Sequence, residues 1–384
     1  MGNIETSGQG NNEATVEQDT KEVHISEKER DLVLKDPEYV GINFDQDNIV
    51  DGRYFWSLDR SLAYVKQDKE RNTEEFRSSL GGLQGFLLEK RNKEIEKIEI
   101  FNKKLESFRG KLKHVRVHPA GELSPLTPSQ AIETNSDGTF DVIISPEFIN
   151  QVKSIKEQVK GDLTLVVQFY DYCRGKEKCS NVPETDEQVE QYIAICEETI
   201  ENVGDDVQLE IGNETNVSRS TGPMFENVLQ HTTNVNPSEY AQFFFKVAKR
   251  IKEKTPSVKL SVAGVACFDP TYLREVLTEV RQLQTEYNVN IPLVDTISFH
   301  PYRKDPKSGS VEVKNGQFVN TELTYKEQVE EMKRIASDFG VHMNVGEINF
   351  SFSDSKQGEK LEEAIDLTKQ EGLVSYIYPG VNVA

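Results

Sequence analysis

Short apolar runs alternate with longer amphipathic segments along most of this chain. The short runs are either continuous in apolar residues or alternate with polar ones at a period of two, which is typical of strands. The longer segments repeat their apolar residues every three or four positions, which is typical of helices. Strands are predicted in this way at 39–45, 113–118, 163–169, about 207–214, 258–265, 294–300, 341–347 and 373–378.

Most of the segments between these strands begin with residues that favour helix starts. Some carry an N-cap residue followed by a first-turn proline, and others carry a capping box, in which the third helical residue bonds back to the cap. The proline starts are Ser145-Pro146, Asn236-Pro237 and Asp269-Pro270, and the capping boxes are Thr185 with Gln188 and Thr324 with Glu327. Further helices are predicted over 73–109, with a kink or a break, and over about 359–371.

Strands that alternate with helices favour a parallel sheet, and eight of them favour a closed (β/α)8 TIM barrel. The main alternative, an open doubly wound sheet, usually begins with a glycine-rich phosphate turn, which Gly41-Ile-Asn-Phe does not supply. No helical pattern follows the eighth strand, so the eighth helix is expected to be incomplete or missing. Residues 20–37 can cover that gap, or the chain is a fragment of a longer one.

Two segments are expected outside the regular barrel pattern. Residues 1–36 are predicted to be a flexible acidic tail, because they carry too few large apolar side chains to offset chain entropy. Residues 37–384 are predicted to form the barrel, with a β-hairpin inserted near 131–144 around an Asp137-Gly138 turn.

The formal net charge of -20 gives an acidic surface that repels phosphate backbones and anionic lipids. Nucleic-acid and membrane partners are therefore not expected, and no apolar run approaches the roughly 18 residues that cross a bilayer. The N-terminal residues show no secretory signal. A monomer is expected.

Four cysteines are too few for a disulfide framework in 384 residues, although Cys173 and Cys179 can pair locally. A zinc site would need two tight Cys/His pairs, which the sequence lacks.

The reactive side chains of a (β/α)8 barrel gather where the strands end. The polar residues at the predicted strand ends are Asp45, Arg116, His118, Gln168, Tyr170, Asn213, Glu214, His300, Tyr302, Glu347, Tyr376 and Tyr378. Two of them are glutamates that close similar strands, Glu214 on the fourth and Glu347 on the seventh. Two carboxyls at one pocket suit glycosidic cleavage, in which one protonates the leaving oxygen and the other attacks the anomeric carbon. A separation of roughly 5–5.5 Å would give retention of configuration.

Three motifs resemble a known family. They are Glu-Ile-Gly-Asn213-Glu214 on the fourth strand, Ser298-Phe-His300-Pro-Tyr302 on the sixth and Gly346-Glu347 on the seventh. Together they resemble clan A of the glycoside hydrolases, whose members are (β/α)8 retaining enzymes with an Asn-Glu acid/base pair on strand four and a nucleophilic glutamate on strand seven. The Gly-Asn-Glu form is similar to heparanase-like β-glucuronidases and arabinofuranosidases, and the His-Pro-Tyr run is similar to the xylosidase and iduronidase group.

The resemblance implies a role for each matching residue. Glu214 is the expected acid/base and Glu347 the expected nucleophile. Asn213 is expected to bind the sugar 2-hydroxyl, and Arg116 to keep Glu347 ionised by charge pairing. The further substrate-binding candidates are His300, Tyr302, Tyr170, His118 and Tyr378. The expected substrate is an oligosaccharide, polysaccharide or glycoside, and no cofactor is needed.

One departure from the clan keeps two other functions open. The clan usually places a tryptophan at the end of the eighth strand, where this chain has Tyr376 and Tyr378, and the sole tryptophan, Trp56, follows the first strand. A catalytically inactive barrel that binds glycans or a protein is one alternative. A barrel enzyme whose carboxylates hold a divalent metal is the other.

Glu210 is expected to be a buried acid paired with Arg116 or a histidine.

N-glycosylation acceptor patterns bear on location. They stand at Asn213-Glu-Thr215, Asn216-Val-Ser218 and Asn349-Phe-Ser351. A glycan on Asn213 would block the predicted pocket. A cytoplasmic or bacterial setting is therefore expected.

Overall fold

The computed structural model describes residues 27–45, 108, 111–118, 125–169, 182–183, 185–217, 236–301, 306–307, 310–314, 317–348 and 356–378. The predicted helix over 73–109 lies outside the described residues except for Phe108. Trp56, Tyr170, Tyr302, Cys173 and Cys179 also lie outside the described residues.

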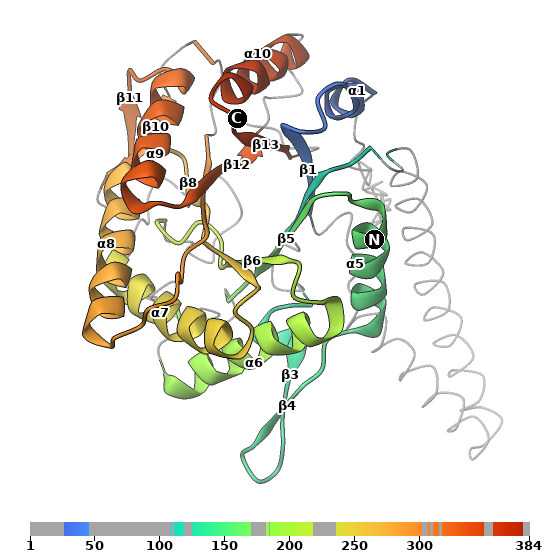
Figure 1. The fold of residues 1–384 in the computed structure, drawn as a ribbon, viewed down its shortest axis with the longest axis vertical. Coiled ribbons are helices and arrows are strands. Elements are labelled where there is room, and N and C mark those ends of the chain that lie inside the picture. Colours follow the sequence, from blue (N-terminus) through green and yellow to red (C-terminus); the bar gives the residue numbers. More distant parts are fainter. Residues whose placement is uncertain are drawn as a thin grey trace, which may run out of the picture.

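Parallel strands close into a barrel, as the sequence pattern predicts (Figure 1). Its strands are β1 (Val40–Asp45), β2 (His114–His118), β5 (Asp162–Val167), β6 (Gln208–Ile211), β7 (Lys259–Val262), β9 (Thr296–His300), β12 (His342–Ile348) and β13 (Val374–Ile377). Each strand pairs with the next in the order β12-β13-β1-β2-β5-β6-β7-β9, and β9 pairs again with β12. The barrel is therefore a closed (β/α)8 fold rather than an open sheet, and a short strand, β8 (Val265–Ala266), is added alongside β9.

The helices form the outer layer around this barrel. They are α5 (Pro146–Gln158), α6 (Asp186–Val203), α7 (Pro237–Lys254), α8 (Pro270–Glu286), α9 (Tyr325–Phe339) and α10 (Gln357–Gln370). The predicted caps are in place: Ser145 accepts a hydrogen bond from the Phe148 N–H, and Thr185 and Thr324 each form a complete capping box. Because these caps are local, they set where each helix begins regardless of the rest of the fold.

One helix occupies a segment that was predicted to be a flexible tail. Helix α1 (Glu27–Lys35) lies beside α10 and buries Leu32 and Val33 (Figure 1). Lys35 Nζ lies 2.7 Å from the Glu362 carboxylate of α10, which ties the two helices at the surface. The tail prediction is wrong for these residues, because two adjacent apolar side chains sufficed to dock the helix. Residues 20–26 of the segment expected to cover the end of the barrel lie outside the described residues, so that expectation stays a prediction.

Two hairpins extend from the barrel. The predicted insertion is present as α4 (Pro128–Ala131) followed by antiparallel β3 (Ile132–Thr134) and β4 (Phe140–Val142). A second hairpin, β10 (Ser310–Lys314) with β11 (Gln317–Thr321), was not predicted. Its signal stands in the sequence, since alternating apolar runs flank Asn315-Gly316, a dipeptide that favours hairpin turns.

Alternation along the barrel strands separates an apolar outer layer from a polar interior. On β2, Val115 and Val117 join the apolar cluster beneath the helices, whereas Arg116 points inward. The residues that line the inside below the site are polar for the most part, namely Arg116, Thr164, Gln208, Glu210, Ser261, Thr296, Ser298, Asn344, Gly346 and Tyr376. The barrel therefore supports buried charged groups from beneath. Among the described helices, none combines the length and apolar character that crossing a bilayer requires.

Candidate functional site

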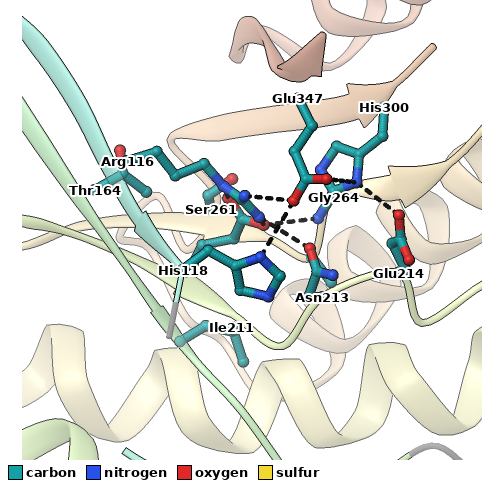
Figure 2. A network of polar contacts seen from close by, with 12 residues as sticks. Arg116, His118, Thr164, Ile211, Asn213, Glu214, Ser261, Gly264, His300 and Glu347 are labelled. Carbon is teal, nitrogen blue, oxygen red and sulfur yellow. Dashed lines mark hydrogen bonds and ion pairs between the residues drawn. The ribbon is translucent and has the colours of Figure 1, made fainter. Parts of the chain in front are cut away.

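Charged and polar side chains from β2, β9, β12 and the segment after β6 converge at the end where the strands terminate (Figure 2). One carboxylate oxygen of Glu214, one of Glu347 and a ring nitrogen of His300 all lie within 4.8 Å of one another. Glu347 is 2 % exposed and Glu214 is 9 % exposed, so both acids are buried rather than on the surface. The structure thus brings together two glutamates that are far apart in the sequence, as predicted.

Glu214 reaches this position through a turn and not by continuation of the strand. Strand β6 ends at Ile211, and Gly212 adopts a φ of 80°, where a Cβ would lie 2.3 Å from the Phe169 ring. Glu214 itself has a φ of 52°, and its N–H donates to the Gly264 carbonyl at 2.7 Å. A left-handed conformation at a non-glycine residue costs about 1–2 kcal/mol, which the surrounding structure has to offset. The strand alternation expected from Glu210 through Glu214 is therefore wrong, because the strand ends at Ile211.

Arg116 is the centre of the buried charge network. Its Nε and Nη2 donate to the two carboxylate oxygens of Glu210 at 3.0 and 2.8 Å, its Nη1 donates to Glu347 at 2.7 Å, and its Nη2 also donates to Asn213 Oδ1 at 2.9 Å. Burial lowers the pKa of the guanidinium, but the charges of Glu210 and Glu347 outweigh it and raise the pKa above its ordinary value. The predicted pairing of Glu210 with Arg116 is confirmed. Arg116 remains a cation and fixes three groups at once.

Glu347 is held as a carboxylate. Its Oε1 receives the bond from Arg116 and lies 3.2 Å from His118 Nδ1. Burial raises the pKa of Glu347, but electrostatic attraction to His300, a hydrogen bond from His118 and the charge of Arg116 together hold that pKa well below its ordinary value. A buried carboxylate that stays ionised is suited to act as a nucleophile.

His300 lies between the two acids. Its Nδ1 hydrogen-bonds to Glu214 Oε1 at 2.9 Å and lies 3.7 Å from Glu347 Oε2. Two glycines leave room for the ring, because a Cβ on Gly264 would lie 2.4 Å from Nε2 and one on Gly346 would lie 3.0 Å from it. The space left by the two glycines explains why the fully buried imidazole can occupy this place.

A second set of bonds stabilises the turn that carries Glu214, and sequence reasoning missed it. Asn216 accepts from the Ala266 N–H at 2.8 Å and donates to the Ala266 carbonyl at 3.1 Å. It also donates to the Asp269 carboxylate at 3.2 Å, and Asp269 caps α8. Burial raises the pKa of Asp269 to about 6, despite the hydrogen bonds that it accepts from Tyr272 and Asn216. The Gly-Asn213-Glu214 motif pointed to Glu214, but no local sequence pattern indicated that Asn216 stabilises the turn.

Two of the polar residues predicted at strand ends lie on the last barrel strand or directly after it. Tyr378 is half-buried after β13, and its N–H donates to the Ile348 carbonyl at 3.1 Å. Tyr376 lies inside the barrel below the site, against Gly41, and cannot replace a stacking tryptophan at the pocket mouth. Cys196 and Cys267 are both buried.

The cluster of Glu214, His300 and Glu347 has the spacing to share one metal ion. An ion placed there would stand close to Arg116, whose guanidinium is only 2.7 Å from Glu347 Oε1. Two like charges at such a distance repel strongly in a buried site. The donor set therefore fits a resident divalent cation poorly.

Comparison with protein-family models finds no match, and no curated protein matches the chain. Solved structures that are similar to it include a broad-specificity GH5-4 endoglucanase from Clostridium longisporum, at 11 % identity and a TM-score of 0.46 over 72 % of this chain and 74 % of that one. A family 39 glycoside hydrolase from the gut symbiont Bacteroides cellulosilyticus has 14 % identity and a TM-score of 0.49, over 72 % of this chain and 52 % of its own. An endo-1,4-β-D-mannanase from Thermotoga petrophila has 14 % identity and a TM-score of 0.46, over 73 % of this chain and 84 % of its own. At such identities the chemistry of the site has to be read from its own residues.

Proposed function

We propose that this chain is a retaining glycoside hydrolase, with Glu347 as the nucleophile and Glu214 as the acid/base. The observation that supports the proposal is the pair of buried carboxyls with oxygens within 4.8 Å of each other and unlike surroundings. Glu347 faces Arg116 and His118, whereas Glu214 is held by His300 and is slightly more exposed. This separation agrees with double displacement, since inverting enzymes need roughly 6.5–9.5 Å to seat a water between the acids.

In the first step, Glu347 attacks the anomeric carbon and the glycosidic bond breaks. Because Arg116 and His118 bind Oε1, the attacking atom in this proposal is Oε2, on the side that faces His300. Protonated Glu214 gives its proton to the leaving oxygen, so the products are an alcohol and a glycosyl ester on Glu347. In the second step, Glu214 takes a proton from water, the water oxygen attacks the anomeric carbon, and the ester bond breaks to restore the Glu347 carboxylate.

Both steps keep the net charge of the buried cluster constant. Glu347 loses its charge when the ester forms, and Glu214 gains one when it gives up its proton. The Arg116–Glu210 pair therefore faces the same total charge before and after each step, which limits the reorganisation that a buried charged site would otherwise need. Asn213, oriented by Arg116 through Oδ1, has its amide nitrogen turned away from the guanidinium and suited to bond the sugar 2-hydroxyl.

The alternative of a catalytically inactive glycan- or protein-binding barrel is less well supported by the geometry. Burying Arg116 with Glu210 and Glu347 costs several kcal/mol of desolvation for each ion, and apolar side chains would often stabilise a barrel equally well. Such a network is typical of a site with a chemical task. For the substrate, the resemblance of the motifs to heparanase-like and xylosidase-type enzymes favours an oligosaccharide, a polysaccharide or a glycoside. We also propose that the protein works without glycosylation at Asn213, which is 1 % exposed.

Substitution of the two acids tests this function. Glu347→Gln and Glu214→Gln should each lower kcat on an activated aryl glycoside by a factor of 1,000 or more, on the order of the 4 kcal/mol that such groups supply. Azide should restore turnover in the Glu214→Gln enzyme by forming a glycosyl azide. Asp295→Asn is the matched control, because Asp295 binds the Leu260 N–H and Lys252 at the N-terminal side of β9. If either glutamine variant turns over at the rate of the Asp295 control, the assignment is wrong.

A further inference from the structure

Gln168 is a buried side chain next to the site, and none of the steps above uses it. It follows β5, is 0 % exposed, and its amide nitrogen lies within hydrogen-bond distance of His118 Nε2. His118 is 4 % exposed, and its other ring nitrogen, Nδ1, lies 3.2 Å from Glu347 Oε1. The three side chains therefore form a line from the end of β5, through the end of β2, to the carboxylate on β12.

The chemistry of a neutral imidazole constrains this line. Burial lowers the pKa of His118, so the ring carries one N–H and one lone pair. A lone pair on Nδ1 would face the Glu347 carboxylate and repel it, so the hydrogen belongs on Nδ1. Nε2 is then an acceptor, and the neighbour that suits it is a donor. The Gln168 amide nitrogen is such a donor, whereas its carbonyl oxygen in the same place would demand the opposite tautomer.

We infer that Gln168 is a positioning residue that selects the Nδ1–H tautomer of His118 and thereby holds an N–H, rather than a lone pair, 3.2 Å from Glu347 Oε1. Together with Arg116, this N–H favours Oε2 as the oxygen that attacks the anomeric carbon. The inference rests on the proposed function for its catalytic consequence. The tautomer itself is a property of the folded chain and is measurable without any substrate.

The first experiment reads the tautomer directly. The full chain contains six histidines and can be labelled with ¹⁵N-histidine. Nitrogen NMR then distinguishes a protonated from an unprotonated ring nitrogen, and the signal that disappears in His118→Ala belongs to His118. We expect neutral His118 with hydrogen on Nδ1 at pH 7, and a mixture of tautomers in Gln168→Met, a variant of similar volume. Hydrogen on Nε2 in the wild-type protein would overturn the inference. The wild-type spectrum tests the tautomer of His118 even if Gln168→Met fails to fold. It also needs no substrate, so its result does not depend on the proposed hydrolase activity.

The second experiment reads the consequence for Glu347. Gln168→Met should lower kcat/KM by up to about 10-fold, because only the molecules that carry the other tautomer lose the N–H directed at the charged Glu347. It should also move the acidic limb of the pH profile to higher pH, because the carboxylate loses a donor. The charged and titratable groups facing Glu347 and His118 are Arg116 on β2, Glu210 and Glu214 on and after β6, and His300 on β9. All of them are unchanged in the variant.

A matched control separates positioning from general damage to the barrel. Gln208 is another buried glutamine, one strand away, and it bonds only to the side chains of Thr164 and Thr296 in the described part of the chain. Gln208→Met should lower stability to a similar extent and leave the pH profile unchanged. In a His118→Ala background, Gln168→Met should have no further effect on kcat/KM. Additive losses, or an acidic limb that does not move, would show that Gln168 only fills space.

Discussion

Replacing Gly264 with alanine tests whether His300 must stand between the two acids. No unusual backbone angle is needed at this position, but the added Cβ would lie 2.4 Å from His300 Nε2, 3.0 Å from Cε1 and 3.2 Å from Cδ2. Ordinary contacts begin near 3.4 Å, so the ring has to move by about 1 Å. The bond from Nδ1 to Glu214 Oε1, now 2.9 Å, cannot survive that shift.

Two magnitudes follow from this displacement. Overpacking of a buried site costs about 1–3 kcal/mol of the free energy of unfolding. Loss of a hydrogen bond to a carboxyl removes about 1.5–3 kcal/mol, which corresponds to a fall in kcat/KM of about 10- to 100-fold. Urea unfolding measures the first, and steady-state hydrolysis of an aryl glycoside measures the second. Gly138→Ala in the hairpin turn, where nothing lies within 4 Å of the new carbon, should leave activity unchanged.

A second variant shows whether the clash with His300 is the cause. In a His300→Ser background the smaller side chain leaves room for the methyl group, so Gly264→Ala should cost almost no additional stability. The difference between the two backgrounds is the coupling free energy of the pair. If Gly264→Ala destabilises both backgrounds equally, or leaves kcat/KM at the wild-type value, the reasoning about the glycine slot is refuted.

Three other outcomes are expected. Arg116→Lys keeps the positive charge but removes the two-pronged contact with Glu210, so it should cost about 1.5–3 kcal/mol in urea unfolding. The acidic limb of kcat/KM should move to higher pH, because Glu347 loses the hydrogen bond from Nη1, and an unmoved limb would contradict this. The pKa of Asp269 is about 6 in the folded protein, above its ordinary 3.8, so the folded state binds the proton more tightly. Stability should therefore rise by at most about 3 kcal/mol as pH falls from 6 toward 3.8, and Asp269→Asn should abolish that rise in pH-dependent unfolding. Dialysis against EDTA should leave glycoside turnover unchanged, and recovery only on adding magnesium or manganese would instead support a metal enzyme.

Much of the fold could be predicted because its signals are local. Caps such as Ser145 and the pair Thr185 with Gln188 act within one helical turn, so the chain segment alone decides them. Strand alternation also reports which residues face the helices, as Val115 and Arg116 show on β2. Helix α1 escaped prediction because its docking depends on α10, more than 300 residues away in the sequence.

The candidate site was predicted in identity but not in detail. Residue type and order pointed to Glu214 and Glu347, and the structure brings their carboxyl groups together. The predicted strand conformation up to Glu214 was wrong, because the backbone turns at Gly212 against the Phe169 ring. The alternation of apolar and polar residues does not encode such a turn.

By itself, the sequence determined which segments form the barrel strands and where the capped helices begin. These features depend on interactions within a few residues, which a linear pattern records. Only the tertiary structure decided which atoms meet: that Arg116 binds Glu210 and Glu347 together, that two glycines make room for His300, and that Gln168 reaches His118. Those contacts arise because closing the barrel between β9 and β12 brings distant strand ends into register, and burial there makes each hydrogen bond and charge pair strong enough to select one arrangement.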